Sequence, residues 1–211
     1  MTKTPLEPPA FDLCAGHPAL DLVNSLDNRF DAAGRRELLQ GYDDLLRFTT
    51  ATGLLEARSA RRLARATGGP AAERVVQAAR ELREALAAVL YRTLRAETPA
   101  AADLKLLERH FQGSSQHREL RWCAATEGAA AGPVRWVRGP YADAAELPVW
   151  LLAESAARLM LSDAAGRVRA CAADPCRWLF LDTSKNHSRR WCKMEVCGNR
   201  MKARRFQARR D

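Results

Sequence analysis

The chain has 211 residues, of which 47% are hydrophobic and 28% are charged. This composition is typical of a folded protein of one or two domains and excludes a disordered polymer. The net charge of +9 is unevenly distributed: residues 171–211 hold 11 Lys/Arg and 4 Asp/Glu, whereas residues 1–170 hold 23 and 21. The C-terminal segment therefore carries most of the excess positive charge, which indicates a polyanionic partner contacted through that segment.

The sequence contains no segment that suggests secretion or membrane insertion. The first residues include no apolar run of signal-peptide length. The most apolar later segment, residues 149–161, is interrupted by Glu154 and Arg158 and is too short to span a bilayer. We therefore expect a cytoplasmic protein without membrane contact, in which the six cysteines are reduced.

Hydrophobic periodicity predicts a mainly helical N-terminal region after a proline-rich leader. The expected helices, in chain order, cover residues 18–26, 42–51, 56–66, 71–96 and 101–111. The longest has apolar side chains at three- and four-residue spacing: Val75, Val76, Ala79, Leu82, Leu86, Val89, Leu90 and Leu94. A helix of that length spans about 39 Å, and we expect it to be the spine of the domain.

A small antiparallel sheet is expected next. Residues 118–126 and 134–138 have the composition of two strands of a hairpin, joined by the small-residue loop 127–133. A further helix over 148–161 and a turn at 163–166 then lead into a cysteine-rich segment. The predicted organisation is an α-rich domain over residues 1–165 and a small module over residues 166–211.

Four of the six cysteines form two pairs of equal spacing in this module. Cys171 and Cys176 are separated by four residues, and so are Cys192 and Cys197. Paired cysteines supply the tetrahedral sulfur donors that Zn²⁺ prefers, and four of them leave no open coordination position for water. The sequence thus predicts one structural zinc ion. Disulfides and inert buried cysteines are the weaker alternatives, and His187, between the pairs, is not needed as a ligand.

The residues around the cysteines predict a compact finger that ends in a helix. About forty residues cannot bury enough apolar surface alone, so metal binding would supply much of the folding free energy. We expect Trp178, Leu179, Phe180 and Trp191 to form a small core beneath the metal. Asn199 is a suitable N-cap for a helix that continues to Arg209. A hairpin between the two pairs, with the second pair leading into a helix, describes a treble-clef-like finger, and the fold class is α+β.

These motifs resemble a known family. Cys-Gly-Asn-Arg at 197–200, with Arg190-Trp191-Cys192 and the segment 180–184 before it, is similar to the CGNR zinc finger. Residues 16–29 resemble the opening of the ABATE domain, chiefly at Leu20-Asp21, Asn24 and Arg29. In bacteria this domain usually precedes the finger. Proteins of this kind are described as proposed stress-induced transcription regulators, so the resemblance implies a nucleic-acid partner.

The final helix could provide the contact with nucleic acid. Arg200 and Arg204 lie on one face, Lys202, Arg205 and Arg209 form a neighbouring stripe, and Arg189 and Arg190 precede the helix. A short cationic helix has the charge for phosphates and the size for a major groove. We expect Met201 and Phe206 to anchor it to the rest of the protein. The alternative is a solvated helix end whose cations complement the helix dipole.

The N-terminal domain offers one candidate ligand pocket. Asp21, Asn24 and the nearby Arg29 could bind a small-molecule effector, although a helix-cap and ion-pair network is the more frequent use of such residues. Cys14 and His17 lack convincing metal spacing, as does the set His110, His117 and Cys123.

No catalytic motif is present in the sequence, so we do not expect an enzyme. The first hypothesis is a DNA-binding transcription regulator. The second is a zinc-stabilised module that binds a protein or a metabolite instead. A homodimer would suit a palindromic site, but no heptad pattern supports one.

Overall fold

The computed structural model describes residues 11–123, 133–174 and 176–208. Its seven α-helices within these ranges are α1 (Pro18–Asn24), α2 (Tyr42–Ala51), α3 (Ala57–Ala66), α4 (Gly69–Leu94), α5 (Ala101–Gln116), α6 (Leu147–Met160) and α7 (Asn199–Gln207). Three two-stranded antiparallel sheets pair β1 (Leu26–Asp27) with β2 (Arg36–Glu37), β3 (Glu119–Trp122) with β4 (Val134–Val137), and β5 (Val168–Ala170) with β6 (Leu179–Leu181). The predicted α+β class, helical with small antiparallel sheets, is confirmed.

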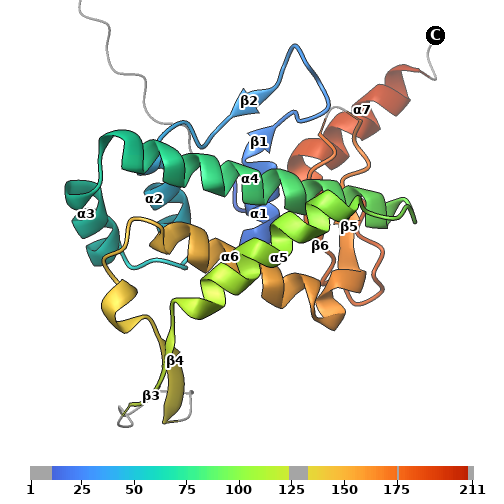
Figure 1. Cartoon of the computed structure of the whole chain (residues 1–211). Coiled ribbons are helices and arrows are strands. Elements are labelled where there is room, and N and C mark those ends of the chain that lie inside the picture. Colours follow the sequence, from blue (N-terminus) through green and yellow to red (C-terminus); the bar gives the residue numbers. More distant parts are fainter. Residues whose placement is uncertain (1–10, 124–132, 175, 209–211) are drawn as a thin grey trace, which may run out of the picture.

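Helix α4 is the spine of the helical body, as its periodicity predicts. It packs against α1, α2, α5 and α6 (Figure 1). Every member of its apolar stripe is buried except Leu94, which lies at the C-terminal end of the helix. The short helix α1 is buried from Ala19 to Asn24. It lies where α4, α6 and β6 meet, so that the first helix of the chain contacts a strand near its C-terminus.

The β3–β4 hairpin follows the predicted pairing within the described residues. Its register runs from Glu119 opposite Val137 to Trp122 opposite Val134. The expected continuation of the first strand and the loop before Pro133 fall on residues 124–132, which lie outside the described ranges. The hairpin projects from the helical body (Figure 1).

The β1–β2 pair was not predicted, because two residues per strand give no readable alternation. Its position is fixed by a buried cation on α4. The Arg83 guanidinium donates to both carboxylate oxygens of Glu37 at 2.6 Å, and its side chain is 3% exposed. Arg83 Nε also donates to Glu84 at 2.8 Å. This ion-pair network holds the segment after α1 against the middle of α4.

The β5–β6 hairpin belongs to two cores at once. Strand alternation directs Val168, Leu179 and Leu181 into the core of the helical body, whereas Phe180 packs with the cysteines. Leu179, which we expected beneath the metal, therefore lies on the opposite face of its strand. The boundary at residues 165/166 remains a prediction, and the hairpin just beyond it contributes to the cores on both sides.

None of the helices within the described ranges combines the length and the apolar character needed to cross a bilayer.

Candidate metal centre and nucleic-acid interface

The four predicted cysteines converge on one point. Their sulfur atoms all lie within 4.8 Å of one another. Cys192 Sγ is 3.5 Å from Cys176 Sγ and 3.6 Å from Cys197 Sγ. Four sulfurs placed tetrahedrally at about 2.3 Å from a metal would be about 3.8 Å apart, so this set is close to the geometry of a thiolate metal site. Across the described ranges, no other group of three His, Cys, Asp or Glu side chains is close enough to hold an ion.

The first cysteine pair lies at the turn of the β5–β6 hairpin. The Cys171 N–H donates to the Trp178 carbonyl at 2.8 Å, which closes the end of the ladder. The Cys176 N–H donates to the Ala173 carbonyl at 2.9 Å, and Arg177 turns the chain with a φ of +56°. The hairpin therefore carries the first cysteine pair at its tip, whereas we expected the hairpin to lie between the two cysteine pairs.

The second cysteine pair is held at the start of the last helix. A single π-helical turn, η3 (Met194–Gly198), runs directly into α7. The N–H groups of Cys197 and Gly198 both donate to the Lys193 carbonyl, at 3.0 and 3.2 Å. The predicted N-cap at Asn199 is wrong, because the helical segment has already begun at Met194. The Asn199 side-chain amide instead donates to the Glu195 carbonyl at 3.1 Å.

Gly198 has an ordinary helical backbone, with a φ of −61°. A β-carbon there would overlap the Met194 sulfur and lie 3.2 Å from the Trp191 ring. Its small size therefore accommodates these side chains.

A buried carboxylate folds the segment between the two pairs. Asp182 is fully buried and accepts hydrogen bonds from the Ser184 hydroxyl at 2.6 Å, the Ser184 N–H at 2.9 Å and the Arg189 N–H at 3.1 Å. These hydrogen bonds, led by the one from the hydroxyl, lower the pKa of Asp182. Asp182 therefore stabilises the conformation of the loop that connects β6 to Cys192.

Arg189 has a structural position that the sequence did not reveal. Its guanidinium lies 4.4 Å from the centre of the Phe180 ring. It also donates to the carbonyls of Trp191 at 2.9 Å, Cys192, and Cys14 at 3.4 Å. Through these contacts of Nε and Nη2, Arg189 braces the cysteine cluster. The contact with a phosphate that we expected for Arg189 stays a prediction.

A fifth cysteine, Cys14, packs against the four. It is outside the set of converging sulfurs. Sequence spacing could not identify this neighbour, because it lies more than 150 residues before Cys171. Close by, Lys193 Nζ pairs with Asp12 at 2.7 Å, which raises the pKa of Lys193. The N-terminal segment thus covers one side of the metal centre.

Asp21 and Asn24 join the helical body to the finger. The Asn24 side chain donates to the Leu179 carbonyl and accepts from the Leu179 N–H, both at 2.9 Å. Asp21 accepts from the Ala15 N–H at 3.0 Å, and the Ala15 carbonyl accepts from the Leu181 N–H at 2.7 Å. Burial raises the pKa of Asp21 to about 6. These residues therefore pack the first helix through hydrogen bonds to the backbone, and within the described residues neither forms the ion pair that the alternative interpretation expected.

Arg29 is separate from that pair. It bonds to Glu84 and to the Val23 carbonyl, the latter at 3.0 Å. It lines a cavity beside α4 that neither Asp21 nor Asn24 lines. The structure thus does not bring the three predicted pocket residues around one cavity.

Helix α7 presents a row of exposed cations. Arg200, Lys202, Arg204 and Arg205 are all exposed, and no ion pair joins any of them to a carboxylate of the described residues. Arg190 is also exposed, with its guanidinium 5.4 Å from the centre of the Trp191 ring.

The two expected anchors of α7 differ. Met201 packs against the cysteine cluster, whereas Phe206 is 62% exposed. The predicted contact residue Arg209 lies outside the described ranges. The helix is therefore held at its N-terminal end, next to the metal centre.

Comparison with known families agrees with this architecture. The model of the CGNR zinc finger matches residues 167–210. The model of the ABATE family, described as "Putative stress-induced transcription regulator", matches residues 16–178. The two matches share residues 167–178, which include β5 and the first cysteine pair. No curated protein matches the chain. Since the second match covers most of the sequence, the chain belongs to the ABATE family and ends in a CGNR zinc finger.

Proposed function

We propose that this protein is a transcription regulator that binds DNA through α7, which one structural zinc ion holds in place. The observation that carries the proposal is the set of four exposed cations on α7, none of which is paired with a carboxylate of the described residues. The helix extends away from the helical body (Figure 1), so a duplex could approach it. An α-helix with its side chains is about 10–12 Å across and so fits the roughly 12 Å width of the major groove, and the nine residues of α7 span about 14 Å along it.

Zinc suits the donor set, and its role would be structural. Four thiolates fill a tetrahedral coordination shell, so no position remains for a water or a substrate. When bound, the ion would cross-link the β5–β6 hairpin to the start of α7. The direction of α7 would therefore depend on the metal. Arg200 lines a cavity of about 330 Å³ together with Cys176, Cys192 and Cys197, so the zinc content of an Arg200 variant has to be measured beside its DNA binding.

The metal assignment is tested by elemental analysis of purified full-length variants. We expect one zinc per chain in the wild type and in Cys14→Ser, which changes a neighbouring cysteine outside the converging set. Cys171→Ser should lose most of the metal, because three thiolates leave an open and weaker site. Equal zinc content in the two variants would contradict the four-cysteine assignment.

The DNA assignment is tested with two triple variants of equal charge change. Arg200→Ala/Arg204→Ala/Arg205→Ala removes cations of α7, whereas Arg58→Ala/Arg61→Ala/Arg65→Ala removes exposed cations of α3, at the far end of the molecule (Figure 1). In a fluorescence anisotropy titration with genomic duplex fragments, only the α7 variant should lose binding. Its zinc content should remain that of the wild type. Equal binding by both variants would refute α7 as the contact. Absence of binding by the wild type would favour a protein- or metabolite-binding module.

A further inference from the structure

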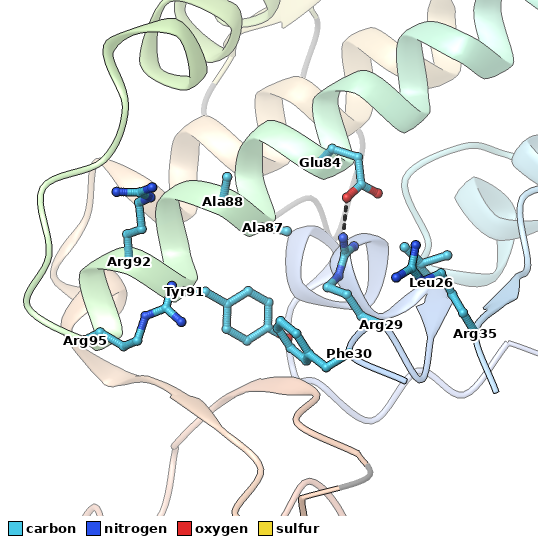
Figure 2. Close-up of a pocket in the computed structure, with 10 residues that line it drawn as sticks. All are labelled: Leu26, Arg29, Phe30, Arg35, Glu84, Ala87, Ala88, Tyr91, Arg92 and Arg95. Carbon is cyan, nitrogen blue, oxygen red and sulfur yellow. Dashed lines mark hydrogen bonds and ion pairs between the residues drawn. The ribbon is translucent and has the colours of Figure 1, made fainter. Parts of the chain in front are cut away.

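An arginine-rich cavity of about 410 Å³ lies beside the C-terminal half of α4. Its lining includes the guanidinium groups of Arg29, Arg35, Arg92 and Arg95 and a single carboxylate, that of Glu84 (Figure 2). The cavity has the volume of a small-molecule site. We propose that it binds a small organic anion in which a phosphate or carboxylate group is attached to a planar ring. This proposal is independent of whether α7 binds DNA.

The excess of positive charge in the lining calls for an anion. Arg35 has no carboxylate partner within the described residues. Arg92 donates to the carbonyl of Thr98, at 3.3 Å, and has no carboxylate partner in the described part of the chain, whereas Arg95 pairs with Glu97 at 3.1 Å. A guanidinium presents parallel N–H donors that match two oxygens of a carboxylate or phosphate. One guanidinium group on either side of the cavity, that of Arg35 and that of Arg92, therefore remains available for an oxyanion.

The floor of the cavity provides a surface for a ring. Phe30 is 58% exposed, yet it is held against Tyr91 edge to face, with 5.0 Å between the ring centres. Figure 2 shows the two rings between Arg92 and Arg95 on one side and Arg29 and Arg35 on the other. A planar group that stacks on Phe30 would direct its anionic substituent toward the guanidinium groups on one side of the two rings.

One wall of the cavity is already fixed without a ligand. The Arg29 side chain is only 12% exposed, and Glu84 and the Val23 carbonyl hold it. Glu84 in turn accepts from Arg83 at 2.8 Å, and Arg83 is locked by Glu37. An ordinary solvated arginine patch has no such supporting network. This preorganisation lowers the entropic cost of binding.

A hydrogen bond links the cavity to the segment that carries the first cysteine pair. A second cavity of about 390 Å³ shares Phe30, Tyr91 and Arg95 with the first and extends to Arg177. The Tyr91 hydroxyl donates to the Arg177 carbonyl at 2.8 Å, directly after the metal ligand Cys176. A ligand that repositions Phe30 or Tyr91 would therefore change a contact of the first cysteine pair.

The test uses zinc-loaded full-length protein and isothermal titration calorimetry without DNA. The probes are a panel of nucleoside monophosphates and aryl carboxylates. Two control probes complete the panel: adenosine has a ring but no anionic group, and inorganic phosphate is an anion without a ring. We expect at least one ring-bearing anion to bind with submillimolar Kd, at least tenfold more tightly than either control probe. The two arms of the panel distinguish a nucleotide from an aryl acid.

Two variants locate the binding. Phe30→Ala and Arg35→Ala/Arg92→Ala change exposed side chains, and each should weaken binding at least tenfold at an unchanged melting temperature. The charge-matched control Arg58→Ala/Arg61→Ala should bind like the wild type. No binding across the panel, or unchanged affinity in both cavity variants, would overturn the proposal. It would also be overturned if the cavity variants lost affinity for DNA alone, because the arginines would then extend the DNA surface.

Discussion

At the scale of single residues, Asn24 is the clearest link between the two parts of the chain. Its side-chain amide forms hydrogen bonds with both the N–H and the carbonyl of Leu179, as the backbone of a neighbouring strand would. Asn24→Ala leaves two buried backbone groups without partners, which we expect to lower the free energy of unfolding by about 2–4 kcal/mol. Urea denaturation measures this loss. Asn28→Gly is the control, because a φ of +48° suits glycine, and an equal loss in both variants would argue against the special role of Asn24.

Asp21 should give the stability of the protein a pH dependence of unusual sign. Burial raises its pKa from 3.8 to about 6, so the folded state holds a proton that the unfolded state releases between these values. Stability contributed by this proton is present below pH 4 and is lost as the pH rises through about 6. Asp21→Asn should remove this loss and gain about 1 kcal/mol at pH 7.5 relative to pH 5.5. Melting temperatures of the two proteins that fall in parallel over this range would contradict the assignment.

The sequence singled out Asp21, Asn24 and Arg189 but did not reveal which groups they contact. Asp21 and Asn24 stood out as a polar pair on an apolar helix, but their partners lie far along the chain, and Leu179 is 155 residues away. Arg189 was similarly predicted to contact a phosphate. Its acceptors in the structure are backbone carbonyls that only the folded chain brings together, so the sequence could not reveal them. The convergence of the four cysteines could be predicted, because two equally spaced pairs are typical of a metal site.

At the scale of elements, long periodic helices were predictable and short pairings were not. The stripe of α4 determines its buried face, so its bounds differ from the prediction by two residues at either end. In contrast, β1, β2, β5 and β6 have two or three residues each, too few for a period to emerge. The start of α7 was misplaced because a π-helical turn precedes it, and this turn has no sequence signal comparable to a cap.

The metal centre and the helical body should respond differently to chelation. Phe180, Met201 and the cysteines form the core of the finger, whereas the helices around α4 have their own larger core. Removing zinc should therefore unfold η3 and α7 and leave the helical body folded. Far-ultraviolet circular dichroism should show a small loss of ellipticity that added zinc restores. A complete loss of helicity on chelation would show that the body also depends on the metal.

At the scale of the whole molecule, the two sequence families describe one interlocked structure. Val168, Leu179 and Leu181 complete the core of the helical body. We expect a truncation that ends at residue 166 to melt at least 10 °C below the full-length protein or to be insoluble, because its core loses three apolar side chains. A truncation that melts within a few degrees of the full-length protein would instead establish two independent domains.

This interlocking makes full-length variants the right material for the decisive measurement, the salt dependence of DNA affinity. Each phosphate contacted by a cation contributes about −0.9 to the slope of log K against log salt concentration. We predict a steep slope for the zinc-loaded wild type and for the α3 triple variant. The variant Arg200→Ala/Arg204→Ala/Arg205→Ala should have a slope shallower by about two to three, as expected when three contacts disappear. Identical slopes in all three proteins would contradict the assignment of α7 as the DNA-binding helix.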